Sequence, residues 1–206
     1  MINWGIIGLG NMADKFASSI KEVKNSKLLG IASTSFLRLK NFGDKYSIEK
    51  KYRFNSYDEI LNCKAINTIY ISTLNNTHQE IIIKAANMKK NVLCEKPVTT
   101  NYEDTIKIFE KINKSNIFFL EAIAYRSHPQ TKFIINKIME NEIGELKSIE
   151  TTFGIHVSMA FNSLRFELGI VGRISLLNQF HARILANAKI FSCVSNHDIC
   201  ATSFRV

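Results

Sequence analysis

Residues 5–13 read GIIGLGNMA, in which a short apolar run ends in glycines. The glycine loop, residues 8–13, has the pattern G-x-G-x-x-A and joins an expected strand, residues 2–8, to an expected helix. Gly8 permits a tight turn, Gly10 allows backbone to approach a pyrophosphate, and Ala13 keeps the helix near the sheet. N–H groups at the helix start face such an anion. The predicted cofactor-binding residues of this loop are Gly8, Gly10, Asn11 and Met12.

Glycine also occurs in ordinary strand-to-helix turns, so the surrounding pattern decides. Apolar runs typical of buried strands alternate with helical patterns, near residues 27–34, 52–54, 66–72, 91–94 and 116–125. Ser56, followed three residues later by Glu59, predicts a capping box where one helix starts. Strands that alternate with helices predict an α/β fold with a doubly wound parallel sheet, the Rossmann arrangement. We place this dinucleotide-binding domain at residues 1–127.

Composition narrows the class of protein. The chain has 206 residues, of which 46% are hydrophobic and 22% charged, enough for one domain and part of another. No apolar run approaches the ~20 residues of a membrane span. The first strand begins almost at once, so we expect no signal peptide. Four cysteines without C-x-x-C spacing argue against a metal cluster or a disulfide framework, so we expect a cytoplasmic protein.

The net charge of +9 raises the question of nucleic acid. The lysines are scattered beside glutamates along helical patterns, as in NYEDTIKIFEKINK, residues 101–114. Basic blocks interleaved with aromatic residues, which a single-strand binding face requires, do not occur. A solvated lysine-rich surface is therefore the interpretation we favour, with no nucleic acid partner.

The end of the second expected strand bears on the choice of dinucleotide. An NAD site usually carries Asp or Glu about 20 residues after the glycine loop, to hold the ribose 2′-hydroxyl. This chain has Ser33 and Thr34 there, followed by Arg38 and Lys40, and no acid. Hydroxyls and cations suit a 2′-phosphate, which favours NADP, with NAD as a possibility. The alternative is that Arg38 and Lys40 only solvate the next helix.

Three further motifs follow the glycine loop in order: ISTLNNTH at 71–78, CEKP at 94–97 and LEAIAYRSHPQ at 120–130. With them the chain, from residue 2 to about 169, resembles the glucose–fructose oxidoreductase/inositol dehydrogenase family. Within it the chain looks most like the sugar (xylose-type) and trans-dihydrodiol dehydrogenases. The resemblance implies an NAD(P)-dependent oxidoreductase that transfers hydride to or from a sugar, polyol or cyclic diol. It also implies an α+β second domain and homo-oligomeric full-length relatives.

The resemblance implies roles for single residues. The lysine that matches Lys96 lies beside the nicotinamide and the reacting hydroxyl, and Glu95 positions this lysine and the ribose. Hydride leaves a carbinol carbon only if the hydroxyl proton is also accepted, and a lysine near a cationic oxidised nicotinamide gives up its own proton more easily. His78 and Arg126 are predicted to contact the cofactor. The alternative for His78 is an exposed residue in the first helical turn, and the alternative for Arg126 is a surface ion pair. The remaining predicted cofactor contacts are Thr73, Leu74 and Asn75.

The last part of the chain departs from the family. Residues 128–206 would be a partial substrate domain, but no Asp-x-Gly-x-x-Tyr or Asp-x-Gly-x-x-His segment follows residue 169. In the family this segment supplies an aspartate near the substrate and a tyrosine or histidine that works with the lysine. Residues 1–154 contain 19 lysines and 3 arginines, whereas 155–206 contain 1 lysine and 4 arginines. Truncation or translation in another frame would produce this change, and divergence is the alternative.

This departure leaves two further hypotheses open for the chain: a catalytically silent dinucleotide-binding module, or a nonfunctional truncated product. We expect NADP(H) binding without turnover. We also expect the atypical segment, residues 170–206, to pack poorly and to expose apolar side chains. These are Leu176, Leu177, Phe180 and Ile184.

Overall fold

The computed structural model describes residues 1–146, 148–153, 180–185 and 203–205. The chain divides into two compact units, Met1–Ala124 and Tyr125–Val206. The predicted roles of residues 1–127 as a cofactor domain and of 128–206 as a substrate domain stay predictions.

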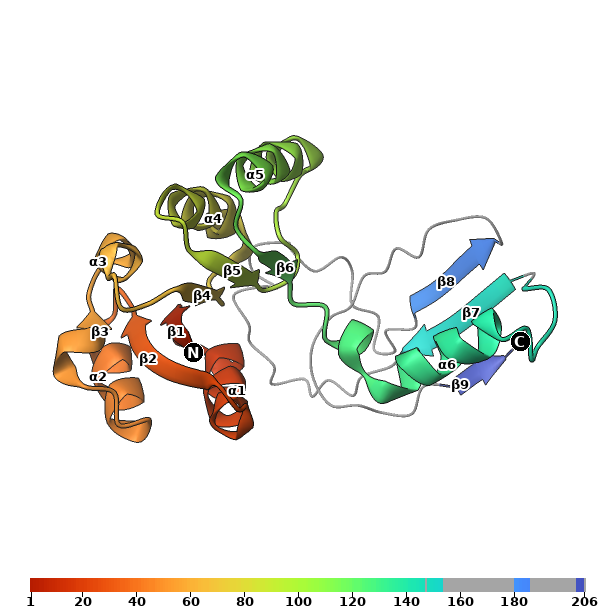
Figure 1. Cartoon of the computed structure of the whole chain (residues 1–206), viewed down its shortest axis with the longest axis horizontal. Coiled ribbons are helices and arrows are strands. Elements are labelled where there is room, and N and C mark those ends of the chain that lie inside the picture. The colour runs from red at the N-terminus through yellow and green to blue at the C-terminus, as the bar shows by residue number, and fades with distance from the viewer. Residues whose placement is uncertain (147, 154–179, 186–202, 206) are drawn as a thin grey trace, which may run out of the picture. The chain divides into compact units, whose positions relative to one another are not determined.

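The first unit is built on a six-stranded sheet in which every strand pair is parallel (Figure 1). Its order is β3-β2-β1-β4-β5-β6, the order of a doubly wound Rossmann sheet, so the predicted fold class is confirmed. The strands are β1 (Ile2–Ile7), β2 (Ser26–Ala32), β3 (Arg53–Phe54), β4 (Thr68–Ile71), β5 (Asn91–Cys94) and β6 (Phe119–Glu121).

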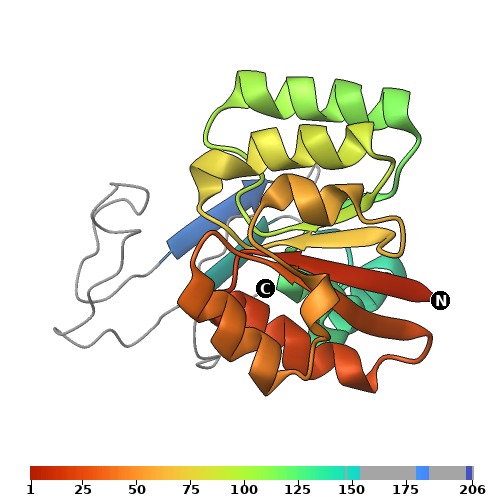
Figure 2. The same cartoon turned by 90° about the vertical axis from the view of Figure 1, so that its left-hand side faces the viewer.

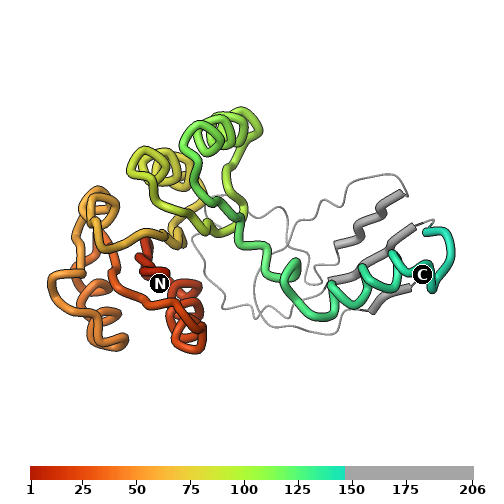
Figure 3. Tube along the Cα trace, in the orientation of Figure 1, coloured from red at the N-terminus to blue at the C-terminus, as the bar shows by residue number. Residues whose placement is uncertain are grey.

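Helices connect these strands and cover both faces of the sheet, as the tube in Figure 3 traces from the N-terminus onward. Figure 2 shows α3, α4 and α5 on one face and α1 and α2 on the other. The helices are α1 (Asn11–Ser19), α2 (Phe36–Lys45), α3 (Tyr57–Asn62), α4 (His78–Asn87) and α5 (Tyr102–Ser115). Helix α1 ends at Ser19, and a 3-10 turn, Ile20–Glu22, follows it.

Side chains cap the start of three of these helices. Ser35 Oγ accepts a hydrogen bond from Arg38 N–H at α2, and Asn101 Oδ1 accepts from Asp104 N–H at α5. At α3 Ser56 is the capping residue, as predicted. Its Oγ accepts a hydrogen bond from the N–H of Asp58, whereas a capping box would use the N–H of Glu59. Such caps satisfy N–H groups that the helix itself leaves without a partner. Helices α1 and α4 have no side-chain cap, and the residue before α1 is Gly10.

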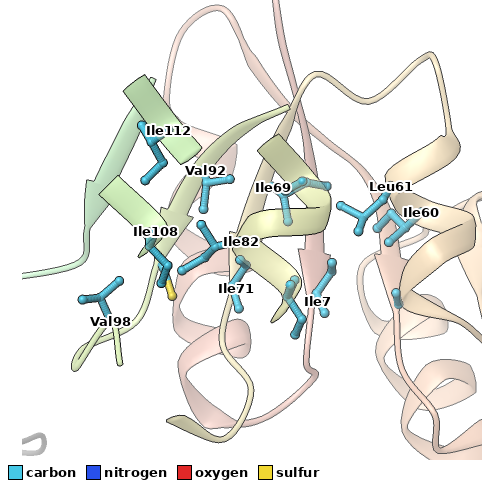
Figure 4. Close-up of a cluster of buried hydrophobic side chains, with 14 of the residues drawn as sticks. Ile7, Ile60, Leu61, Ile69, Ile71, Ile82, Val92, Val98, Ile108 and Ile112 are labelled. Atoms are coloured by element: carbon cyan, nitrogen blue, oxygen red, sulfur yellow. The ribbon is translucent and has the colours of Figure 1, made fainter. Parts of the chain in front are cut away.

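The core of this unit lies in two layers, one on each face of the sheet. On β4, Ile69 and Ile71 face α3, α4 and α5, whereas Tyr70 faces α1 and α2, as expected from the alternation of side chains along a strand. Figure 4 shows the first layer, in which Ile82 of α4 lies between Ile108 of α5 and Ile71 of β4. All four residues of β4 are buried, so this strand is the centre of the unit.

The second unit begins in a 3-10 turn, Ala124–Ser127, which leads into α6 (Pro129–Met139). Helix α6 ends at Met139, and Gly144 beyond it has the positive φ of +72° that favours glycine. Strand β7 (Ser148–Phe153) pairs antiparallel with β8 (Phe180–Leu185) and with β9 (Ser203–Arg205). The sequence did not predict β8 or β9.

Residues 170–206 were expected to pack poorly, and the structure describes two strands among them, β8 and β9. The expected exposure of the four apolar side chains falls outside what the structure describes. Within the described ranges, no helix combines the length and the apolar character that crossing a membrane requires.

The two-layer core makes a prediction for Ile82, which is fully buried, whereas Ile106 on α5 is 41% exposed. We expect Ile82→Ala to lower the free energy of unfolding by about 2–5 kcal/mol, because it leaves a cavity beneath the sheet. The control, Ile106→Ala, is expected to cost less than about 0.5 kcal/mol. Urea unfolding followed by circular dichroism measures both, and equal losses would contradict the assignment of this core.

Candidate functional site

Four loops meet at the carboxyl edge of the sheet, because the parallel strands β2, β1, β4 and β5 are neighbours and all end there. In open sheets of this kind ligands bind at this edge, where the strand order reverses. Hydrogen bonds of 2.9 to 3.2 Å tie each loop to the next: Gly8 N–H donates to Ala32 O, Ser72 N–H to Ile7 O, and Glu95 N–H to Ile71 O.

The two glycines of the glycine loop serve different purposes. Gly8 has a φ of +89°, and a Cβ there would lie 2.7 Å from the backbone oxygen of Ser72, so the fold itself requires glycine. Gly10 is exposed, its φ is −99°, and a Cβ there would meet nothing within 4 Å. The protein alone therefore does not require glycine at this position. The space beside Gly10 is what a pyrophosphate needs in order to approach the backbone.

The start of α1 suits an anion for a second reason. No side chain caps this end, so the N–H groups of its first turn face outward, at the positive end of the helix dipole. Asp14, an acid in that turn, is paired with Lys45 Nζ at 2.6 Å and with Tyr46 Oη at 2.7 Å. The hydrogen bond from Lys45 lowers the pKa of the Asp14 carboxyl, and Tyr46 lowers it further. The residues of the glycine loop thus fit the pyrophosphate of a dinucleotide.

The residues predicted to contact a 2′-phosphate, in and after the loop that follows β2, differ in their exposure to solvent. Ser33 is buried, and its hydroxyl oxygen accepts a hydrogen bond from Ser35 N–H at 3.1 Å. Thr34 and Arg38 are exposed at the carboxyl edge, and residues 33–38 contain no acid. Thr34 and Arg38 are thus accessible to an anionic group, whereas Ser33 shapes the turn.

The lysine turn, residues 95–98, follows β5 at the same edge. Glu95 is only 4% exposed, and its Oε1 accepts a hydrogen bond from Tyr70 Oη at 2.6 Å. Val98 N–H donates to Oε1 of Glu121, at the end of β6, at 2.9 Å. Lys96 is half-buried between these two anchored positions.

Sequence reasoning gave no role to Tyr70 or Glu121. For Tyr70 the available signal was a hydroxyl-bearing residue inside an otherwise apolar strand, INTIYIS. A side chain on the face opposite Ile69 and Ile71 is directed toward α1, but that face can be assigned only once the register is known. Glu121 belongs to the motif LEAIAYRSHPQ, residues 120–130, yet nothing in that pattern indicates that its side chain binds the lysine turn.

His78 joins the lysine turn to the loop after β4, residues 72–77. It is fully buried, with Nδ1 2.9 Å from Pro97 O and Nε2 3.3 Å from Thr73 O. The alternative of an exposed residue in the first helical turn is therefore wrong. In the same loop Asn75 is buried and Leu74 is 39% exposed. The cofactor contacts predicted for Thr73, Leu74, Asn75 and His78 stay predictions.

Arg126 belongs to the second unit, where it is exposed in the 3-10 turn before α6. Its predicted cofactor contact stays a prediction. Among the residues with described positions, no three His, Cys, Asp or Glu side chains gather as a metal site would require.

A parallel sheet of order 3-2-1-4-5-6, with a glycine loop opening the first helix at its carboxyl edge, defines a dinucleotide-binding Rossmann domain. Residues 2–123 match the family model described as "Oxidoreductase family, NAD-binding Rossmann fold", and the chain belongs to this family. The family resemblance inferred from the four motifs is thereby confirmed.

Curated relatives include both kinds of dehydrogenase that the motifs indicated. The chain is 26% identical over 155 residues to trans-1,2-dihydrobenzene-1,2-diol dehydrogenase of Danio rerio, covering 74% of this chain and 46% of that protein. It is 25% identical over 169 residues to D-xylose 1-dehydrogenase (NADP(+)) 2 of Haloferax volcanii, covering 82% and 51%. The chain thus spans about half the length of the curated relatives it matches.

Among solved structures, scyllo-inositol dehydrogenase from Lactobacillus casei, with bound NAD(H) and scyllo-inositol, superposes with a TM-score of 0.70. The sequence identity is 22%, and the match covers 75% of this chain and 45% of that one. At this identity the match supports the fold.

The contrast between the two glycines gives a matched pair of variants. We expect Gly8→Ala to destabilise the fold by at least about 1–3 kcal/mol, because φ is positive and the Cβ meets backbone. We expect Gly10→Ala to leave the stability unchanged or slightly higher, and to weaken NADPH binding at least ~10-fold by occupying the space of the pyrophosphate. Urea unfolding and titration of NADPH fluorescence measure the two effects.

The assignment of the pyrophosphate to the space beside Gly10 depends on Gly10→Ala weakening NADPH binding without destabilising the fold. A Gly10→Ala chain that binds NADPH as tightly as the wild type would contradict it, and so would one that loses affinity only because it unfolds.

Proposed function

We propose that the chain is the dinucleotide-binding part of an NADP-preferring dehydrogenase, which transfers hydride between the nicotinamide and a carbinol or carbonyl carbon. The observation that carries this proposal is the shared edge of the sheet. The open space at Gly10 and the half-buried Lys96 lie in loops that belong to β1 and β5, with only β4 between these strands. The names of the curated relatives favour a dehydrogenase over a silent binding module.

The residues of the carboxyl edge divide the work of binding. Amide groups at the start of α1 would hold the pyrophosphate, and the loop after β2 would hold the adenosine ribose. The loop after β4 and the lysine turn would then lie along the nicotinamide half. When bound, the nicotinamide accepts or supplies the hydride.

Lys96 supplies the proton chemistry in this proposal. The reacting hydroxyl has to lose its proton as its carbon loses hydride, and the reverse holds for reduction of a carbonyl. The Lys96 amine would accept or donate that proton at Nζ. Its turn is held on both sides, through Glu95 to Tyr70 and through Val98 to Glu121, so the amine stands on a backbone that is already fixed. Such fixed geometry is what a positioned acid–base group requires.

The substrate class follows from the relatives, whose names give a cyclic diol and a sugar. We infer a small carbinol substrate of one of these kinds, including polyols. Homo-oligomeric assembly of full-length relatives and a cytoplasmic location, both expected from the sequence, belong to the same proposal.

A preference for NADP is supported by exposed Thr34 and Arg38, by the absence of an acid in residues 33–38, and by a relative that is named as NADP(+)-dependent. A hydrogen bond to a charged group contributes roughly 1.5–3 kcal/mol. We therefore expect Arg38→Ala to weaken NADPH binding by about 10- to 100-fold and to leave NADH binding unchanged.

Lys40 on the same helix is also exposed, which makes Lys40→Ala the matched control. Fluorescence titrations with NADPH and NADH compare the two variants. The preference is refuted if Arg38→Ala and Lys40→Ala have the same effect, or if the wild type binds both dinucleotides equally.

The role of the lysine is testable in a full-length relative that carries a lysine at the position of Lys96. Changing that lysine to alanine is expected to lower kcat/KM at least ~10²-fold, the usual scale for a positioned acid–base group. Dinucleotide affinity is expected to change far less, because the glycine loop holds the pyrophosphate. Steady-state kinetics and fluorescence titration separate the two, and a normal kcat in the variant would remove the lysine from the mechanism.

A further inference from the structure

A buried carboxylate stands next to the proposed acid–base lysine. Among the described residues, the buried side chains that ordinarily carry a charge other than histidine are Lys90 and Glu95. Lys90 is satisfied by the backbone, because its Nζ donates hydrogen bonds to Cys63 O and Ile66 O. A buried carboxylate is costly unless donors satisfy it, so the donor to Glu95 is a structural necessity. That donor is the hydroxyl of Tyr70.

The Tyr70 ring is held rigidly in place. It stacks on Phe16 of α1, with 4.2 Å between the ring centroids and an angle of 23°, and Phe16 in turn meets Trp4 of β1 edge-on. Tyr70 itself is 2% exposed. Because the ring cannot swing away, the hydroxyl oxygen stays 2.6 Å from Glu95 Oε1. Through its stacking on Phe16 and its hydrogen bond to Glu95, Tyr70 links helix α1 to the lysine turn.

Tyr70 acts as the donor across the ordinary pH range. Burial raises the pKa of its phenol well above the usual value, and the negative charge of Glu95 raises it further. The phenol therefore keeps its proton, and the carboxylate receives it as a hydrogen bond. A phenylalanine would fill almost the same space between Phe16 and the sheet, so packing alone does not explain a hydroxyl at this position.

We propose that Tyr70 is a positioning residue: its hydroxyl fixes the Glu95 carboxylate and thereby sets the charge next to Lys96. Glu95 and Lys96 are consecutive in one turn, so the proposal places a fixed negative charge one residue from the lysine along the chain. A nearby negative charge favours the protonated amine. The role in turnover rests on the proposed function, whereas the link from Tyr70 to Lys96 is testable in the chain alone.

The test is trace labelling of the folded chain with acetic anhydride, with the relative rate at each lysine read by mass spectrometry. Only the unprotonated amine reacts, so at a fixed pH the rate at an accessible lysine rises with the fraction of its amine that is unprotonated. In Tyr70→Phe we expect Lys96 to react at least ~3-fold faster relative to the other lysines, because a carboxylate that is no longer fixed stabilises the ammonium less. Glu95→Gln removes the charge itself and is expected to act in the same direction.

Tyr46→Phe is the matched control, because Tyr46 also donates to a carboxylate, Asp14 Oδ1 at 2.7 Å, away from the lysine turn. It is expected to leave the relative rate at Lys96 within about 1.5-fold of the wild type. Adding Tyr70→Phe to Glu95→Gln is expected to give no further change, since the hydroxyl acts through the carboxylate.

An unchanged Lys96 rate in Tyr70→Phe would overturn the proposal, as would a rise spread over all lysines, which would indicate general loosening. If Tyr70→Phe does not fold, Glu95→Gln tests the step from the carboxylate to Lys96, and an unchanged Lys96 rate there overturns the proposal. NADPH titration of the same wild-type sample tests the proposed function separately. Failure to bind would overturn that function, and the labelling result would still decide the link to Lys96.

Discussion

The arrangement of the candidate site depends on the close approach of Gly8 to Ser72. The Ser72 hydroxyl donates to Gly8 O at 2.7 Å, and the left-handed backbone at Gly8 turns the chain over the end of β4. A side chain at Gly8 would push these two loops apart, and with them the start of α1 and the loop that leads to His78. The requirement for glycine is therefore steric at Gly8, whereas at Gly10 it makes sense only with a ligand present.

The lysine turn shows a second constraint, which is electrostatic. Its backbone and its carboxylate are bound by side chains from three different elements: Tyr70 of β4, His78 of α4 and Glu121 of β6. Each of these is buried or half-buried, so each hydrogen bond replaces water that the turn would otherwise need. The outcome is a turn whose geometry is set by the sheet beneath it, with Lys96 as the half-buried side chain at its centre.

Much of the fold could be predicted from the sequence, because its signals are local. Alternating apolar runs and helical patterns gave the strands of the Rossmann sheet, and Ser56 gave a helix start at the correct residue. The role of Tyr70 could not be predicted, because it depends on a contact across 25 residues and on the face of β4 that the residue occupies. The burial of His78 was missed for a similar reason: its partner, Pro97 O, belongs to a loop 19 residues away. Strand β8 was missed although FHARIL, residues 180–185, alternates apolar and polar residues, because its pairing with β7 joins distant parts of the chain. Strand β9 spans only three residues, Ser203–Arg205, too few to show a pattern.

The central claim is that a dinucleotide binds across the carboxyl edge of this sheet with its pyrophosphate at the start of α1. Titration of the ¹⁵N-labelled chain with NADPH, followed by amide chemical shifts, tests it most directly. The account predicts the largest shifts at residues 10–13, with further shifts at 34–38 and 95–98 and small ones along α3, Tyr57–Asn62. Shifts that leave residues 10–13 unchanged at saturation, or that concentrate along α3, would contradict it.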